Sequence, residues 1–123
     1  MLYCNQIIIK YIMQIREINL KELYTVHNVI KELYTDLSYK EFEDLVYDMK
    51  YMQYQMFGVF EKGELVTYAG IAVQTTFVDK RHLKVFDFIT SIKYDSCKYD
   101  KIMKEYLDDY AKVAMCEKVK YEN

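Results

Sequence analysis

Residues 85–112 contain an apolar strand, a short polar turn and an amphipathic helix in direct succession, and this order restricts the folds open to the chain. The strand is predicted within "LKVFDFITSI", and the turn is "DSCKYD", residues 95–100. An apolar stripe at helical spacing then runs from Ile102 to Ala114, and "EKVKYEN" is typical of a last strand. Because a helix of this length can cross over between parallel neighbours, the chain is predicted to form a mixed sheet flanked by helices.

The first part of the chain predicts one strand and two helices. "QIREI", residues 14–18, alternates polar and apolar side chains as a strand does. A helix then runs to about Tyr34 or Leu37, because one apolar stripe recurs at steps of three and four. Ser38 and Glu41 have the spacing of a reciprocal capping pair at the start of a second helix. The stripe of the first helix consists of Leu23, Val26, Ile30, Leu33 and Leu37.

The middle of the chain predicts a hairpin of two long strands. "YQMFGVFEKGELVTYAGIAVQTTF" is strongly apolar on both sides of "EKGE", where Gly63 supplies the positive φ of a tight turn. The mostly apolar run after this turn indicates a strand that is covered on both faces. A loop at "VDKRH" then leads to the strand before residues 95–100. The predicted order is therefore β-α-α-β-β-β-α-β, an α/β (α+β) chain.

Composition limits the class of protein. The 123 residues include no proline and no linker-like tract, so residues 13–123 are expected to form one domain, with residues 1–12 as an N-terminal extension. A net charge of −2 provides no basic field for nucleic acid or for an anionic membrane, and the apolar run near the N-terminus is too short to span a bilayer. Cys4, Cys97 and Cys116 lack CxxC spacing, which favours a reduced cytoplasmic protein without a metal site.

The element order and the strand, turn and helix of residues 85–112 resemble the GNAT superfamily of acyl-CoA-dependent N-acetyltransferases. In that family a turn of the form Arg/Gln-x-x-Gly-x-Gly/Ala joins the fourth strand to the next helix, and "DSCKYD" falls on this turn without a gap. The resemblance covers residues 13–123 and implies a GNAT-like, mostly antiparallel sheet. It departs from the family at Asp95, which replaces Arg or Gln, and at Lys98 and Asp100, which replace the two small residues.

The resemblance also implies where acetyl-CoA would bind as co-substrate. In the family the backbone of the fourth strand bonds the pantetheine, and the backbone N–H groups of the turn hold the pyrophosphate. The matching positions are Phe88, Ile89, Thr90 and Ser91 in the strand and Asp95, Ser96, Cys97, Lys98, Tyr99 and Asp100 in the turn. The acids would repel phosphate, and an N-cap carboxylate would occupy its donors, whereas Lys98 would attract it. The alternative for this turn is a well-capped helix start that binds no ligand.

Asp87 is the candidate general base, because some family members carry a carboxylate near this place in the strand. The alternative is a solvent-facing or salt-bridged acid. His82, expected at the end of the preceding loop, is a second candidate because imidazole titrates near neutral pH, and its alternative is a merely exposed loop histidine. Cys97 lies beside Lys98 at a helix start, which favours a lowered thiol pKa, against the alternative of an inert thiol.

Two hypotheses follow from the resemblance. The first is an N-acetyltransferase that moves an acetyl group from acetyl-CoA to a primary amine of a small molecule or protein. The second is a non-catalytic GNAT-fold protein whose CoA site has decayed and which acts through self-association or a protein partner. Family members usually continue past the last strand predicted here with a helix and two strands, so a homodimer that covers the exposed sheet edge is a further expectation.

Overall fold

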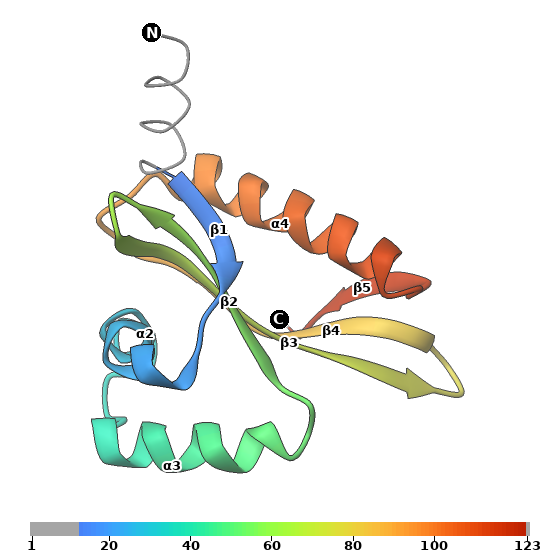
Figure 1. The fold of residues 1–123 in the computed structure, drawn as a ribbon, viewed down its shortest axis with the longest axis horizontal. Coiled ribbons are helices and arrows are strands. Elements are labelled where there is room, and N and C mark those ends of the chain that lie inside the picture. The colour runs from blue at the N-terminus through green and yellow to red at the C-terminus, as the bar shows by residue number, and fades with distance from the viewer. Residues whose placement is uncertain (1–12, 123) are drawn as a thin grey trace, which may run out of the picture.

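The computed structural model describes residues 13–122, so the predicted N-terminal extension lies outside the described residues. The elements follow the predicted order, with one additional 3₁₀ turn before the first helix (Figure 1). They are β1 (Met13–Glu17), η1 (Leu20–Glu22), α2 (Leu23–Ile30), α3 (Tyr39–Lys50), β2 (Gln55–Glu61), β3 (Glu64–Thr76), β4 (Lys80–Thr90), α4 (Ser96–Val113) and β5 (Lys118–Tyr121).

The five strands form one sheet in the order β1-β2-β3-β4-β5. The first four pair antiparallel, and β5 pairs parallel to β4 after the crossover through α4, which confirms the predicted mixed, mostly antiparallel sheet. At the β2–β3 turn Lys62 has a φ of 50° and Gly63 a φ of 81°. Two successive positive φ values match the right-handed twist of the flanking strands, so this turn closes the predicted hairpin.

The sheet separates two hydrophobic cores. Figure 1 shows α2 and α3 on one face of the sheet and α4 on the other. On one face α2 and α3 pack through residues such as Val26 and Val46, and on the other α4 packs through Met103 and Leu107, all of them fully buried. β3 lies between the two cores, and its eight consecutive residues 65–72 are buried, as its apolar run predicts. Among residues 13–122, no helix is long and apolar enough to cross a membrane.

The first helix is shorter than predicted. α2 ends at Ile30, and the backbone N–H groups of Lys31 and Glu32 donate to the carbonyls of His27 and Val29 at 2.9 and 3.1 Å. Leu33, predicted on the buried stripe, lies in the following turn with 57% of its surface exposed. Leu37 packs onto the core after this turn, so its apolar side chain falls at helical spacing although the helix has ended. The sequence pattern alone therefore predicts one long helix.

The second helix starts as predicted. The Ser38 hydroxyl oxygen accepts from the backbone N–H of Glu41 at 3.2 Å, and the Glu41 carboxylate accepts from the backbone N–H of Ser38 at 3.3 Å. This capping box satisfies two backbone donors at the helix end.

The strand β4 is longer than predicted. It begins at Lys80, so residues 80–82 of "VDKRH" belong to the strand and only Phe77, Val78 and Asp79 form the turn. The polar residues 80–82 form a strand because β3 pairs with them on one side. From His82 onward β5 pairs with β4 on the other side. Asp79 reinforces this end of the sheet, since its carboxylate bridges Lys118 and Lys120 of β5 at 2.7 and 2.8 Å.

We expect Leu107→Ala to lower the free energy of unfolding by about 2–5 kcal/mol, because it opens a cavity at a fully buried site in the core under α4. Leu33→Ala is the matched control and should change it by less than about 0.5 kcal/mol, since Leu33 is mostly exposed. Urea unfolding followed by circular dichroism measures both. Equal losses would contradict the placement of Leu33 outside the core.

Candidate functional site

The strand β4 continues beyond the end of its pairing with β5. The parallel pairs run from His82↔Lys118 to Val85↔Tyr121, whereas β4 extends to Thr90. Within the described part of the chain, residues 86–90 of β4 therefore have no strand partner on this side. The space between the separating strands is a cavity of about 320 Å³, here called the β4–β5 notch. It is lined by Val85, Phe86, Phe88, Asp100, Lys104, Tyr121 and Glu122.

A β-bulge in β4 lies beside this notch. Gly70 of β3 pairs with Asp87 and the next residue, Ile71, pairs with Val85, so Phe86 is an extra residue in β4. Both Phe86 and Asp87 consequently reach Tyr54 on the α3 side of the sheet. The Phe86 and Tyr54 ring centres lie 6.0 Å apart, and the Tyr54 hydroxyl lies 2.7 Å from an Asp87 carboxylate oxygen. Bulges often re-aim a side chain beside an active site, and this one turns the Asp87 carboxylate toward α3.

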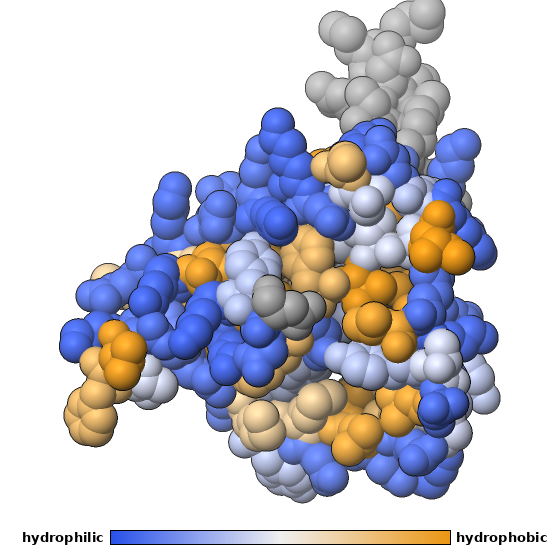
Figure 2. All heavy atoms as spheres, turned by 180° about the vertical axis from the view of Figure 1, so that it is seen from behind, coloured by the Kyte–Doolittle hydropathy of each residue, from blue (hydrophilic) through white to orange (hydrophobic). Residues whose placement is uncertain are grey.

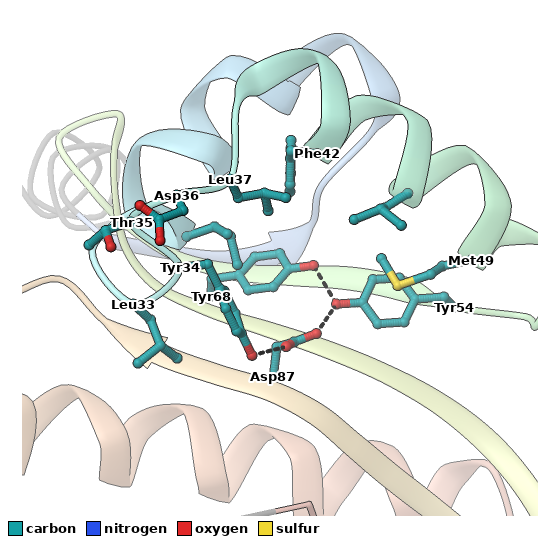
Figure 3. A pocket seen from close by; sticks show the side chains of 12 residues that line it. Leu33, Tyr34, Thr35, Asp36, Leu37, Phe42, Met49, Tyr54, Tyr68 and Asp87 are labelled. Atoms are coloured by element: carbon teal, nitrogen blue, oxygen red, sulfur yellow. Dashed lines mark hydrogen bonds between the residues drawn. The ribbon is translucent and has the colours of Figure 1, made fainter.

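The Asp87 carboxylate is the centre of a hydrogen-bonded cluster (Figure 3). Tyr54 donates to its Oδ2 at 2.7 Å, and Tyr34 donates to its Oδ1 at 3.3 Å. The Tyr54 and Tyr68 hydroxyls lie 2.7 Å apart. Gly70 makes room for this arrangement, because a Cβ there would lie 1.5 Å from the Tyr54 oxygen. The bulge at Phe86 and the space beside Gly70 thus allow the Asp87 carboxylate to accept hydrogen bonds from Tyr34 and Tyr54.

Burial keeps the cluster's phenols protonated. Tyr54 and Tyr68 are 2% and 1% exposed, and desolvation raises the pKa of both hydroxyls far above 10, with the Asp87 charge adding to the effect. Burial followed by the Asp87 charge also raises the pKa of Tyr34. The phenols therefore act as hydrogen-bond donors, and Asp87 is the acceptor on which they converge.

Asp87 forms part of the wall of a second cavity, of about 570 Å³, which lies between the sheet, α3 and the loop after α2 and is here called the α2–α3 pocket (Figure 3). Figure 2 shows apolar side chains gathered on this part of the surface, along α3. The lining residues are Ile30, Leu33, Tyr34, Thr35, Asp36, Leu37, Phe42, Leu45, Met49, Tyr54, Tyr68 and Asp87. The notch and the pocket are thus adjacent along β4, where Val85, Phe86 and Phe88 line the notch and Asp87 lines the pocket.

The turn before α4 is a capped helix start. Asp95 is the N-cap, and its Oδ1 accepts from the backbone N–H of Cys97 at 3.0 Å. Asp100 faces the notch and accepts from the Thr90 hydroxyl at 2.5 Å. Lys98 is exposed, with its Nζ 5.0 Å from the centre of the Tyr99 ring. The backbone N–H of Tyr99 donates to the Asp95 carbonyl at 3.1 Å, so the N–H groups of Cys97 and Tyr99 are both occupied. One carboxylate of the turn borders the notch.

Two of the predicted turn and strand residues direct their side chains into the cores. Tyr99 is 5% exposed and donates to Glu61 at 2.7 Å, a bond that, together with burial, raises its pKa to about 12. Ile89 packs in the core under α2 and α3. Their side chains are therefore directed away from the notch. Ser91 is also buried, and its hydroxyl donates to Glu32 at 2.9 Å, which anchors the chain after β4 to the end of α2.

Ser96 and Cys97 lie in the first turn of α4 with exposed side chains, and Cys97 is a free thiol. Phe88 borders the notch directly.

His82 lies away from Asp87, and its predicted place in a loop is wrong. It is inside β4 and 2% exposed, because the strand begins earlier than its polar sequence indicates. Its Nδ1 lies 2.9 Å from the Lys80 carbonyl oxygen. Asp87 lies five positions further along the extended strand, which corresponds to roughly 17 Å. The structure therefore does not bring the two candidate bases together.

Sequence reasoning missed the tyrosines of the site and the notch residues Lys104 and Tyr121. Lys104 Nζ lies 5.8 Å from the ring centres of Phe88 and Tyr121. The Tyr121 hydroxyl is buried and has no hydrogen-bond partner among residues 13–122, and burial raises its pKa to about 12. The chain has 14 tyrosines, and no spacing distinguishes these from those that only pack.

We expect Tyr54→Phe to lower the free energy of unfolding by about 1–3 kcal/mol, because it leaves the buried Tyr68 hydroxyl without its partner. Tyr34→Phe also removes a hydroxyl that donates to Asp87, but this bond is longer, at 3.3 Å, and Tyr34 is 46% exposed. The free energy of unfolding should therefore change by no more than about 0.5 kcal/mol. Chemical unfolding at neutral pH measures both. An equal effect of the two variants would contradict the buried cluster.

The raised tyrosine pKa values predict a loss of stability in alkali. Above pH 10 a tyrosine of the unfolded chain releases its proton while buried Tyr54 keeps it, so the folded state binds more protons and stability falls as pH rises. Each such tyrosine contributes about 1.4 kcal/mol per pH unit to this slope. Unfolding free energies measured between about pH 10 and 11 should therefore fall less steeply in Tyr54→Phe than in the wild type. Identical slopes would rule out a protonated, buried Tyr54.

No family model matches the sequence, and no curated protein does either. Solved structures do match. A GNAT family acetyltransferase from Staphylococcus aureus superposes with a TM-score of 0.76 at 12% identity, covering 91% of this chain and 87% of the other. A ribosomal-protein-alanine N-acetyltransferase from Brucella melitensis gives 0.76 at 12% identity over 90% and 79%. An aminoglycoside N-acetyltransferase solved with CoA gives 0.74 at 13% identity over 90% and 76%. The chain therefore has the fold of the GNAT superfamily.

Proposed function

We propose that this protein is an N-acetyltransferase that transfers an acetyl group from acetyl-CoA to a primary amine. The observation that carries the proposal is the pair of cavities adjacent at β4, with the β4–β5 notch on one side and the α2–α3 pocket, with Asp87 in its wall, on the other. An acyl donor in the notch and an amine in the pocket would meet at Phe86, Asp87 and Phe88. Bringing two reactants together in this way is itself a large part of catalysis.

The thioester end of the donor fits the notch. Pantetheine is an extended chain with two amides, and the unpaired backbone of residues 86–90 offers the hydrogen-bonding groups that a further strand would use. The apolar walls from Phe88 and Tyr121 suit its methylene groups. The likeness to an acetyltransferase solved with CoA supports the same assignment. Backbone N–H groups of this edge would also stabilise the negative charge that develops on the thioester carbonyl oxygen.

The diphosphate end of the donor fits the turn less well. Ser96 and Lys98 remain to offer backbone N–H groups, and the Lys98 side chain is free to pair with a phosphate. The backbone N–H of Cys97, however, already donates to the Asp95 carboxylate. The negative charges of Asp95 and Asp100 also repel phosphate. We therefore expect a donor affinity that comes mainly from the pantetheine half.

Asp87 is proposed as the group that takes the proton. A primary amine enters as an ammonium ion and transfers one proton to the Asp87 carboxylate, and the neutral nitrogen then attacks the thioester carbonyl carbon. The carbon–sulfur bond breaks, the nitrogen loses a second proton, and the thiolate is protonated, which leaves an amide and a free thiol. Tyr34 and Tyr54 fix the orientation of Asp87 by their two hydrogen bonds. His82 has no part in this scheme because of its distance along β4.

We expect isothermal titration to show acetyl-CoA binding with a Kd below about 1 mM. Asp95→Asn should tighten this binding about tenfold, because asparagine also caps a helix and the change removes one repelling charge. Asp109→Asn, on the exposed face of α4, changes the net charge equally and should have no effect.

Asp87→Asn should leave the acetyl-CoA affinity unchanged and lower kcat/KM for acetyl transfer to an amine by about 10²–10⁴. Failure of acetyl-CoA to bind the wild type at millimolar concentration would reject the proposal and favour the non-catalytic alternative, in which Asp95 and Asp100 serve only the helix start.

A further inference from the structure

We infer that the α2–α3 pocket selects a small primary amine that carries one positive charge on a hydrophobic aryl or alkyl body. The inference rests on the proposed function for the role of this amine as acyl acceptor. Its binding, however, depends only on the pocket and is measurable without an acyl donor. A volume of about 570 Å³ lies within the range of small-molecule sites.

The walls of the pocket are mainly hydrocarbon. Six aliphatic, thioether or phenyl side chains contribute to them, and α3 supplies three of these. Leu33 and Leu45 are 57% and 48% exposed in the absence of an occupant, so a hydrophobic body would remove apolar surface from water. The six are Ile30, Leu33, Leu37, Phe42, Leu45 and Met49.

Among the described residues that line the pocket, the charged side chains are all negative. They are Asp36 and Asp87, and none of these described residues is a lysine, arginine or histidine. The Asp87 carboxylate has about four acceptor positions, of which the two tyrosines use two, so an ammonium group can still bond to it. Figure 3 shows this carboxylate deep among the tyrosine rings, whereas Asp36 lies apart from it in the loop after α2.

This combination excludes several other amine classes. An amino acid or a phosphorylated amino sugar carries an anionic group, which would meet no cation in the lining and would lose its hydration. A polyamine or an aminoglycoside carries several charges and few apolar groups, so most of its ammonium groups would face hydrocarbon. A monoamine with an apolar body pairs its one charge with Asp87 and buries the rest.

Four probes of similar size test the inference by isothermal titration against the full chain without acetyl-CoA. They are 2-phenylethylamine, the uncharged 2-phenylethanol, phenylalanine and spermidine. We expect 2-phenylethylamine to bind at least about tenfold more tightly than each of the others, since only it combines one cation with an apolar body and carries no anion. Equal or tighter binding of phenylalanine or spermidine, or no detectable binding of 2-phenylethylamine, would overturn the inference.

Two variants identify the site of binding. Asp87→Asn keeps the shape of the pocket. It should weaken the binding of 2-phenylethylamine about tenfold or more and leave the affinity for 2-phenylethanol unchanged. Leu45→Lys places a cation at the half-exposed wall and should have a similar effect on the amine. Val113→Lys, 85% exposed at the end of α4, is the matched control and should have none. Unchanged amine affinity in both pocket variants would place binding elsewhere and contradict the inference.

The outcome is separable from that of the proposed function. Binding of 2-phenylethylamine without binding of acetyl-CoA would support the pocket and reject the transferase. Binding of acetyl-CoA without binding of 2-phenylethylamine would support the transferase and reject this class of acceptor. An acetylated lysine peptide as product, with no acetylation of the free amine, would likewise reject it.

Discussion

The separation of β4 from β5 after Val85 is the constraint on which the site depends. Where both neighbours pair with β4, its backbone groups are satisfied within the sheet. From residue 86 onward the described strands leave one edge of β4 unpaired, so another partner can bond there. The bulge at Phe86 comes at the same point, so the strand gains a free edge and a re-aimed carboxylate within three residues. The notch lies at this irregularity, which also places the Asp87 carboxylate in the wall of the pocket.

The start of α4 shows two demands on the same backbone groups. A helix start is stabilised when an N-cap oxygen such as that of Asp95 accepts from its N–H groups. A diphosphate would use the same donors and would be repelled by the same charge. Stability of the helix and affinity for a nucleotide thioester thus oppose each other here, whereas the notch along Phe88 requires only backbone groups and apolar walls.

The fold could be predicted from local patterns, because these act over a few residues. The Ser38 capping box, the Gly63 hairpin and the double burial of β3 each follow from a motif or a run in the sequence. The end of α2 and the start of β4 could not, since packing of Leu37 and pairing with β5 override the local pattern. In the α2–α3 pocket the sequence indicated only Asp87, because its partners Tyr54 and Tyr34 lie 33 and 53 residues away in the chain.

A crystal structure of the protein grown with CoA tests the central claim most directly. The account predicts that the pantetheine chain lies along residues 86–90 of β4, with its sulfur near the bulge and Asp87 across the strand. CoA bound at another surface, or β5 closed against β4 so that the notch is absent, would contradict it.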